Sequence, residues 1–295
     1  MEPVLIEYAS EKYPQKLRDI ENPPSRLYAI GNIEILNEIG IAVVGSRTNT
    51  QYGEKMCKKF VKGLVEYNIN IISGLAYGID SIAHETCLKN TGKTIAVLPS
   101  GLNNICKATN KGFIKPILEN NGVIISEYEN SISADSPKFL ERNRIVAGLG
   151  IGTLVVEAGY RSGTRVTARY TIENERLLFC IPSSLENIKG KTTNELIRQG
   201  AKLVTCVEDV ICDIHKSNQE IELTKKNKKK NLLFNISPEL VSVFKEIDDI
   251  PKDINYIARK TKLPISEVNY KIMLLQLEGK IVEKPGHKFV RNEEN

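Results

Sequence analysis

Glycine, serine and arginine follow a short apolar run near the start of the chain, in the order Gly45-Ser46-Arg47. A glycine lets the backbone approach an anion closely, and a hydroxyl together with free N–H groups donates hydrogen bonds to phosphate oxygens. An arginine adds a permanently charged donor that binds a phosphate through two parallel hydrogen bonds. These three residues therefore predict an anion site for a phosphate-bearing ligand.

Other loops of the chain have a similar composition. Each follows an apolar run and contains small or hydroxyl-bearing candidates for binding, which are Ser73, Gly74, Ala76 and Gly78 in one loop and Ser162, Gly163 and Thr164 in another, with Ser100-Gly101 between them. In open parallel sheets, ligands bind beyond the carboxyl ends of the strands. We therefore expect these loops to converge on one edge of a sheet.

Basic residues cluster near the last of these loops. Between positions 142 and 169 the chain has five arginines, at 142, 144, 161, 165 and 169, against one acidic residue, Glu157. Arg142, Asn143 and Arg144 are therefore candidate contacts for a phosphate backbone. Phe139 precedes them and fits either a core position or a platform on which a nucleic-acid base stacks.

Three polar residues near the loops have a structural interpretation. Asp80 and His84 lie one helical turn apart, and a capping aspartate with a hydrogen-bonded histidine is favoured over a catalytic pair. Glu157 is expected to hold an arginine in place. No G-x-G-x-x-G follows the first apolar run, and neither a G-x-x-x-x-G-K-[ST] nor a G-x-S-x-G motif occurs, so we predict no enzyme and no cofactor. The six cysteines form no C-x-x-C pair, so no metal site is expected.

The net charge of +5 is unevenly distributed. Residues 1–215 carry 25 basic and 24 acidic side chains, residues 216–230 carry six and two, and residues 231–295 carry ten of each. A protein that coats DNA without a defined site is usually basic throughout. If this chain binds nucleic acid, it does so at a focused site.

The pattern of apolar runs and amphipathic segments predicts an α/β fold with a Rossmann-like, doubly wound and mostly parallel sheet. Expected strands cover residues 41–44, 70–73, 94–98, 123–126, 153–156 and 178–181, and expected helices cover 52–67, 79–90, 143–149 and 165–174. Residues 1–40 are interpreted as an N-terminal lead-in of short elements, and residues 41–215 as the candidate DNA-binding domain.

The remainder of the chain predicts a linker and a second domain. Residues 216–230 include the run Lys225-Lys226-Asn227-Lys228-Lys229-Lys230, which is typical of a solvated basic linker. Residues 231–295 show three helical segments followed by a hairpin, which predicts a winged-helix domain. The N-terminus has neither a basic region nor an apolar run that would indicate a secretory signal, and no apolar stretch is long enough to span a membrane. We therefore expect a cytoplasmic protein.

Taken in order, the loops resemble those of one known family, the DNA processing protein A (DprA) family, also called Smf. The motifs that carry the resemblance are Val44-Gly45-Ser46-Arg47, Ser73-Gly74-x-Ala76-x-Gly78-Ile79-Asp80 with Ala83-His84, Phe139-x-x-Arg142-Asn143-Arg144-Ile145-Val146-Ala147-Gly148-Leu149, Val156-Glu157-Ala158 and Ser162-Gly163-Thr164-x-x-Thr167-Ala168. The match runs from about Tyr13 to Val210, and the predicted winged helix resembles the C-terminal domain of that family.

The resemblance implies a Rossmann-like core that binds single-stranded DNA and forms homodimers. It implies a recombination mediator that loads the RecA recombinase onto the strand and relieves competition from single-strand binding protein, in natural transformation (competence) and homologous recombination. It places Arg47 on a DNA-contacting arginine of the family, Phe139 on the phenylalanine before the Arg-Asn-Arg motif, and Lys107 near a family lysine that follows a Tyr-Pro pair. All three are therefore candidate DNA contacts. The chain departs from the family pattern at Ile105-Cys106, where the family usually has Tyr-Pro, at Leu140, where a proline is common, and at Ser183, where glycine is usual.

Two other functions remain open at this point. The arrangement also resembles nucleotide phosphoribohydrolases of the lysine-decarboxylase-like group, whose P-G-G-x-G-T-x-x-E motif supplies a catalytic glutamate. This chain has Thr167 where that glutamate would fall, so the enzyme ranks below the binding protein. Alternatively the winged helix reads DNA, although its third helix begins Ser266-Glu267 and an acidic first turn is unfavourable next to a phosphate backbone.

Overall fold

The computed structural model describes residues 3–103, 111–160, 162–217, 237, 239–248 and 250–292. The chain divides into two compact units, Met1–Lys226 and Asn227–Asn295. No helix within the described ranges is long and apolar enough to cross a membrane.

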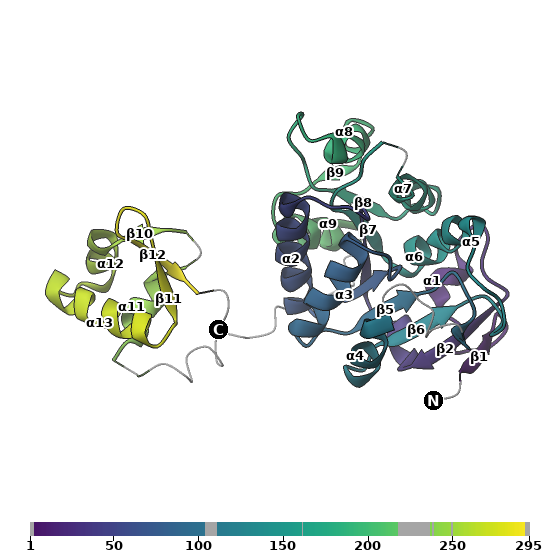
Figure 1. Cartoon of the computed structure of the whole chain (residues 1–295), viewed down its shortest axis with the longest axis horizontal. Helices are drawn as coiled ribbons and strands as arrows, with labels where there is room; N and C mark the ends of the chain where they lie inside the picture. The colour runs from purple at the N-terminus through teal and green to yellow at the C-terminus, as the bar shows by residue number, and fades with distance from the viewer. Residues whose placement is uncertain are drawn as a thin grey trace. The chain divides into compact units, whose positions relative to one another are not determined.

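The first unit contains a sheet with nine strands in the described part of the chain (Figure 1). Their order is β1-β2-β6-β5-β4-β3-β7-β8-β9. Their bounds are Val4–Glu7 (β1), Arg26–Gly31 (β2), Gly40–Val44 (β3), Asn70–Ser73 (β4), Thr94–Val97 (β5), Val123–Ser126 (β6), Gly152–Val155 (β7), Leu177–Cys180 (β8) and Lys202–Leu203 (β9). The strands β6, β5, β4, β3, β7, β8 and β9, which are neighbours in this order, are all parallel to one another. In contrast, β2 pairs antiparallel with both β1 and β6. The predicted α/β class with a mostly parallel sheet is confirmed.

Helices cover both faces of this sheet because each central strand is apolar on both sides (Figure 1). In β3, Ala42 and Val44 pack into one core with α1, α6, α7 and α8, whereas Ile41 and Val43 pack into a second core with α2, α3 and α9. The helices are Gln15–Arg18 (α1), Gln51–Glu66 (α2), Ile79–Lys89 (α3), Ile114–Glu119 (α4), Ser136–Glu141 (α5), Asn143–Leu149 (α6), Thr164–Glu173 (α7), Lys191–Arg198 (α8) and Val207–Ser217 (α9). The sheet is therefore doubly wound.

The ends of the first unit differ in detail from the expected divisions of the chain. The segment expected as a lead-in, residues 1–40, supplies strands β1 and β2 of the sheet itself. Residues 216 and 217, expected in the linker, are the last residues of α9. The lysine run of the expected linker lies outside the described residues.

The second unit combines helices with a small antiparallel sheet. It contains Val241–Glu246 (α11), Ile254–Thr261 (α12), Ile265–Leu277 (α13) and the strands Lys252–Asp253 (β10), Ile281–Lys284 (β11) and Lys288–Arg291 (β12), in the order β10-β12-β11. Its core includes Val243, Ile257, Val268, Ile272 and Phe289. In the described part of this unit, α11, α12 and α13 precede the hairpin of β11 and β12, as expected. The winged-helix assignment of residues 231–295 stays a prediction.

Candidate nucleic-acid interface

The strand order reverses direction at β3, which pairs with β4 on one side and β7 on the other. The helices that follow these two strands lie on opposite faces of the sheet, α2 after β3 and α7 after β7. Open α/β sheets bind ligands at such a switch point. Hydrogen bonds join the loops there. The Ser46 N–H donates to the Glu157 carbonyl (2.6 Å), the Thr164 hydroxyl to the Gly45 carbonyl (3.1 Å), and the Ile79 N–H to the Ser46 carbonyl (3.1 Å). Loops predicted from three strands thus form one surface.

Two glycines permit this close approach. Gly78 has φ = +77°, and a Cβ there would lie 2.2 Å from the carbonyl oxygen of Ser46. A Cβ at Gly45 would lie 2.6 Å from Cγ1 of Ile79. Since each larger residue would push the loops apart, both glycines are required by packing between loops. A further role for them in binding an anion stays a prediction.

Arg47 is exposed at the centre of this surface, with its guanidinium 5.1 Å from the centre of the Phe139 ring. Phe139 is half-buried on α5, whose residues are all exposed or half-buried. The Asp135 carboxylate caps this short helix by accepting a hydrogen bond from the Lys138 N–H (3.0 Å). The pair combines a cation with an aromatic ring in a geometry typical of cation–π contacts.

Arg142 has a different environment, because only 3% of its surface is exposed. Its Nη1 donates to the carbonyl oxygens of Gly74 (2.7 Å) and Val97, and so ties the ends of β4 and β5 together. A Cβ at Gly74 would lie 2.4 Å from Nη2, so the glycine makes room for the guanidinium. Burial lowers the pKa of Arg142 to about 10, while Asp80 acts in the opposite direction.

Asp80 and His84 belong to the same buried network. The Asp80 carboxylate accepts from the Gly74 N–H (3.1 Å), and its pKa is raised by burial against the opposing effect of Arg142. Nδ1 of His84 lies 2.7 Å from the Thr94 hydroxyl, which itself donates to the Ile71 carbonyl (2.7 Å). Nδ1 therefore carries the proton. Burial lowers the pKa of His84 to about 3, so the ring is neutral near pH 7.

The remaining sequence candidates are either engaged by other protein groups or reached by solvent. Ser73 is buried and donates to the Val43 carbonyl (2.7 Å). Arg144 forms a two-pronged ion pair with Glu127 (2.9 and 2.5 Å), and the two side chains are 17% and 15% exposed. Solvent reaches, at least in part, Ser46, Arg47, Ala76, Gly78, Phe139, Asn143, Ser162 and Gly163. The Asn143 amide donates to the Gly163 carbonyl (3.4 Å). Lys107 lies outside the described residues.

Glu157 holds the loops together through groups other than an arginine. Its carboxylate accepts from the backbone N–H of Thr50 (2.8 Å), the hydroxyl of Thr50 (2.7 Å) and the side-chain amide of Asn187 (2.9 Å). Asn187 was not predicted from the sequence, because it lies thirty residues from Glu157 and no local pattern links the two. A second unpredicted contact comes from Lys189, whose Nζ donates to the Thr48 carbonyl beside Arg47.

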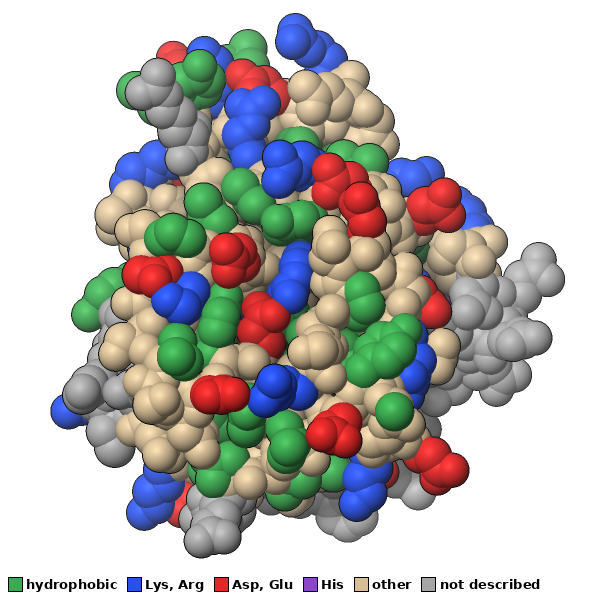
Figure 2. All heavy atoms as spheres, turned by 90° about the vertical axis from the view of Figure 1, so that its right-hand side faces the viewer, with side chains coloured by type: hydrophobic (Ala, Val, Ile, Leu, Met, Phe, Trp, Pro, Cys, Tyr) green, Lys and Arg blue, Asp and Glu red, His purple; other side chains and the backbone are tan. Residues whose placement is uncertain are grey.

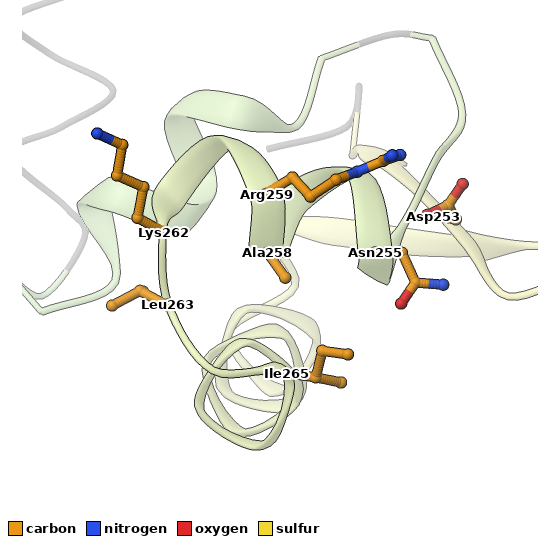
Figure 3. A pocket seen from close by; sticks show the side chains of 7 residues that line it. All are labelled: Asp253, Asn255, Ala258, Arg259, Lys262, Leu263 and Ile265. Atoms are coloured by element: carbon orange, nitrogen blue, oxygen red, sulfur yellow. The ribbon is translucent and has the colours of Figure 1, made fainter.

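Charges of both signs are mixed on another face of this unit. On the face around the β1–β2 edge, acidic and basic side chains alternate without a region of one sign (Figure 2), and one such pair joins Arg26 to Glu129 (3.2 Å). A pocket of about 630 Å³ lies on the second unit, lined by residues of α12 such as Arg259, by Lys262 and Leu263 after that helix, and by Ile265 at the start of α13 (Figure 3). It contains none of the sequence-predicted site residues.

Among the described residues, no group of three or more His, Cys, Asp or Glu side chains is placed to hold a metal ion.

Comparison with known sequences decides the family. The sequence model of the family described as DNA recombination-mediator protein A matches residues 4–215. The chain belongs to this family. The resemblance predicted from the loop motifs is thus confirmed, and the family places the chain in DNA processing.

Individual family members match over most of the chain. Protein Smf of Escherichia coli K12 is 33% identical over 287 residues, which cover 96% of this chain and 76% of that protein. DNA processing protein DprA of Streptococcus pneumoniae R6 is 39% identical over 201 residues, which cover 68% of this chain and 71% of that protein.

Two solved structures of family members are similar in three dimensions. The X-ray structure of DprA from S. pneumoniae matches with a TM-score of 0.66 at 36% identity, over 71% of this chain and 74% of that one. A structure of DprA from Helicobacter pylori, which concerns the single-stranded DNA binding mode of that protein, matches with a TM-score of 0.64 at 29% identity, over 73% of this chain and 96% of that one.

Proposed function

We propose that this family member binds single-stranded DNA at the switch point between β3 and β7, and that Arg47 and Phe139 are its central contacts. The observation that carries the proposal is the exposed Arg47 guanidinium held over the Phe139 ring. A guanidinium binds the phosphate backbone, and an aromatic ring stacks on a base of any sequence. The single-stranded DNA binding of the similar H. pylori protein supports the same ligand.

The proposal assigns different roles to the other candidates. The surface around Arg47 is lined by Gly45, Ser46, Ala76, Gly78, Asn143, Ser162, Gly163 and the more deeply buried Thr164. Ser73, Gly74, Asp80, His84, Arg142 and Glu157 hold the loops from beneath. Arg144 acts mainly through Glu127, and Lys107 stays a proposed contact.

The carboxylates of this edge support binding over catalysis. Asp80, Glu127 and Glu157 are each engaged by protein donors, through Gly74, Arg144 and Thr50 respectively. Thr167, at the position of the hydrolase glutamate, is buried. Cleavage of an N-glycosidic bond requires a carboxylate that reaches the substrate, so a phosphoribohydrolase is disfavoured. Release of free base from AMP would contradict this.

Binding of fluorescent oligo-dT across a range of salt concentrations tests the site. Arg47→Ala should weaken binding and lower the slope of log affinity against log salt by about 0.7, the value for one lost contact to a single strand. Arg169→Ala is the matched control. The Arg169 side chain is also exposed, at 62%, but it pairs with Glu173 on α7 and is not a proposed strand contact. Equal affinity and equal slope for Arg47→Ala and the wild type would reject the site.

We further propose that the chain is a cytoplasmic homodimer that loads RecA onto single strands, against competition from single-strand binding protein, during natural transformation and recombination. The test is RecA filament formation on strands coated with single-strand binding protein. The wild type should shorten the delay before filaments form, and Arg47→Ala should not. If the wild type binds the strand and leaves the delay unchanged, the mediator role is rejected while strand binding stands.

A further inference from the structure

An exposed aromatic and apolar surface lies beside the Arg47 site, after β7 and β8. Tyr160 is 62% exposed in the loop after β7, and Leu185 and Ile188, in the loop after β8, are 94% and 79% exposed. Side chains of this kind are usually buried, and several together at the ligand edge of a sheet indicate a binding surface. None of the three is among the contacts proposed above.

This surface is continuous with the Arg47 site. Lys189, which follows Ile188, donates from Nζ to the Thr48 carbonyl of the Arg47 loop. A Cβ at Gly159 would lie 3.7 Å from Cα of Lys189, so the loops after β7 and β8 are in contact. On the other side, a Cβ at Gly163 would lie 3.8 Å from the side chain of Leu140, next to Phe139. The Phe139 helix and the Tyr160 loop are therefore neighbours.

A lysine lies beside the exposed ring of Tyr160. Nζ of Lys191 lies 5.8 Å from the centre of the Tyr160 ring, and Lys191 is exposed at the start of α8. Two carboxylates near this ring are engaged by other protein groups, Glu157 by Thr50 and Glu195 by Arg165 (3.1 Å). A third, Glu186, is exposed in the loop after β8. A ring that solvent reaches, with a cation beside it, thus occurs twice at this edge: the half-buried Phe139 with Arg47 and the exposed Tyr160 with Lys191.

We propose that Tyr160, Lys189 and Lys191 form a second subsite for the same single strand, in which a base stacks on Tyr160 and a phosphate contacts Lys191. The inference rests on the proposed function. Adjacent strands of a sheet lie about 4.8 Å apart. Tyr160 follows β7, the neighbour of β3, and Lys191 follows β8, so the second subsite extends from about 5 to about 10 Å from the end of β3. A stacked strand rises about 3.4 Å per nucleotide, so this subsite begins about one to two nucleotides from Arg47 and ends about three nucleotides away. The strand runs across the ends of β3, β7 and β8.

Oligo-dT of increasing length separates the two subsites. Lengths from about 4 to 16 nucleotides span the sizes that comparable folds bind. Tyr160→Ala should leave the affinity for the shortest strands unchanged and weaken that for the longer ones by about tenfold, the usual effect of losing one stacked base. Tyr160→Phe keeps the ring and should bind like the wild type. Lys191→Ala should lower the salt slope only for the longer strands.

Tyr270→Ala is the matched control, because Tyr270 on α13 of the second unit is 58% exposed. It should bind all lengths like the wild type. Photocrosslinking of oligo-dT to the full-length chain adds a readout that does not depend on a variant: a crosslink at Tyr160 is expected with long strands and not with the shortest ones.

The outcomes separate this inference from the proposed function. If Arg47→Ala weakens binding at every length while Tyr160→Ala has no effect at any length, the second subsite is rejected and the proposed function stands. If Tyr160→Ala weakens every length equally, Tyr160 belongs to the first site and a separate subsite is again rejected. If Arg47→Ala has no effect, the proposed function fails at its central residue. Loss of RecA stimulation by Tyr160→Ala with unchanged strand affinity would reassign the surface to a protein partner.

Discussion

Arg47 and Arg142 lie at the same edge of one sheet, and both favour the charged form of Asp80. Arg142 is buried and donates to two strand-end carbonyl oxygens, whereas Arg47 is exposed over an aromatic ring. The first fixes the distance between the ends of β4 and β5, and the second is available to a ligand. The same residue type therefore supports the loops in one region and, in the function that we propose, binds the strand in the other. Burial distinguishes the two.

The comparison extends to the arginine cluster between residues 142 and 169. Arg144, Arg165 and Arg169 are paired with Glu127, Glu195 and Glu173. Arg161 lies outside the described residues. Ion pairs within the fold thus neutralise part of the local net charge of +4 that the sequence gives for residues 142–169. An arginine that can contact a ligand must therefore be identified from its exposure.

The largest expected loss of stability is that of Arg142→Met, which breaks the buried network of Arg142, Asp80 and the carbonyl oxygens of Gly74 and Val97. The substitution leaves the Asp80 carboxylate and two buried carbonyl oxygens without their cation, so we expect a loss of about 3–5 kcal/mol in the free energy of unfolding. Urea unfolding measures it. Arg142→Lys keeps the charge and should lose less. A change within about 0.5 kcal/mol for Arg142→Met would show that the buried network does not stabilise the fold.

His84 makes the same region sensitive to acid. Its pKa falls from 6.5 to about 3 on folding because burial excludes the charged form, with Arg142 adding to the effect. Below pH 6.5 the unfolded chain binds a proton that the native ring does not, so stability decreases as the pH falls. At pH 5 the loss should be about 2 kcal/mol relative to pH 7. Asp80, whose pKa is raised by burial, acts in the opposite direction.

The variant His84→Gln isolates this contribution, because glutamine does not titrate. Urea unfolding at pH 7 and pH 5 gives the stability difference for each protein, and the difference should be smaller in the variant than in the wild type by about 2 kcal/mol. An equal difference in both proteins would show that His84 is not the acid-sensitive group.

The sequence predicted the central strands well, because a parallel strand covered on both faces is a continuous apolar run. The predicted 153–156 and 178–181 differ from β7 and β8 by one residue at each end. The strands β1 and β2 were not predicted. β2 pairs with β1 and joins the rest of the sheet through β6, about a hundred residues away. No local pattern indicates a pairing over that distance.

Residue types at the site were predictable, and their roles were not. Glycine before a polar loop indicated Gly45 and Gly78, but their requirement comes from contacts with Ile79 and Ser46. The motif around residues 139–144 contains one exposed helix, one buried arginine and one ion-paired arginine. Exposure depends on which helix face meets the sheet, and that is decided by the whole packing. A resemblance to a family indicates which positions matter. The structure is needed to tell the residues that hold the loops from those that could contact a ligand.

Arg144→Ala should have an intermediate effect, because its ion pair with Glu127 is neither exposed nor fully buried. We expect a loss of about 1–2 kcal/mol in the free energy of unfolding and no change in the salt slope of strand binding. The double variant Arg144→Ala with Glu127→Ala measures the coupling. A salt slope lowered as much as in Arg47→Ala would move Arg144 from the framework to the binding surface.

The smallest effect on stability is expected for Arg47→Ala, and it completes the comparison with Arg142. The Arg47 side chain is exposed and its contact with Phe139 is a cation–π contact at the surface, so the free energy of unfolding should change by no more than about 0.5–1 kcal/mol. Strand affinity should nevertheless fall, because the substitution removes the proposed phosphate contact. Urea unfolding and oligo-dT binding on the same preparation give both values. A stability loss as large as that of Arg142→Met would mean that Arg47 also serves the framework, and its weaker binding would then reflect unfolding.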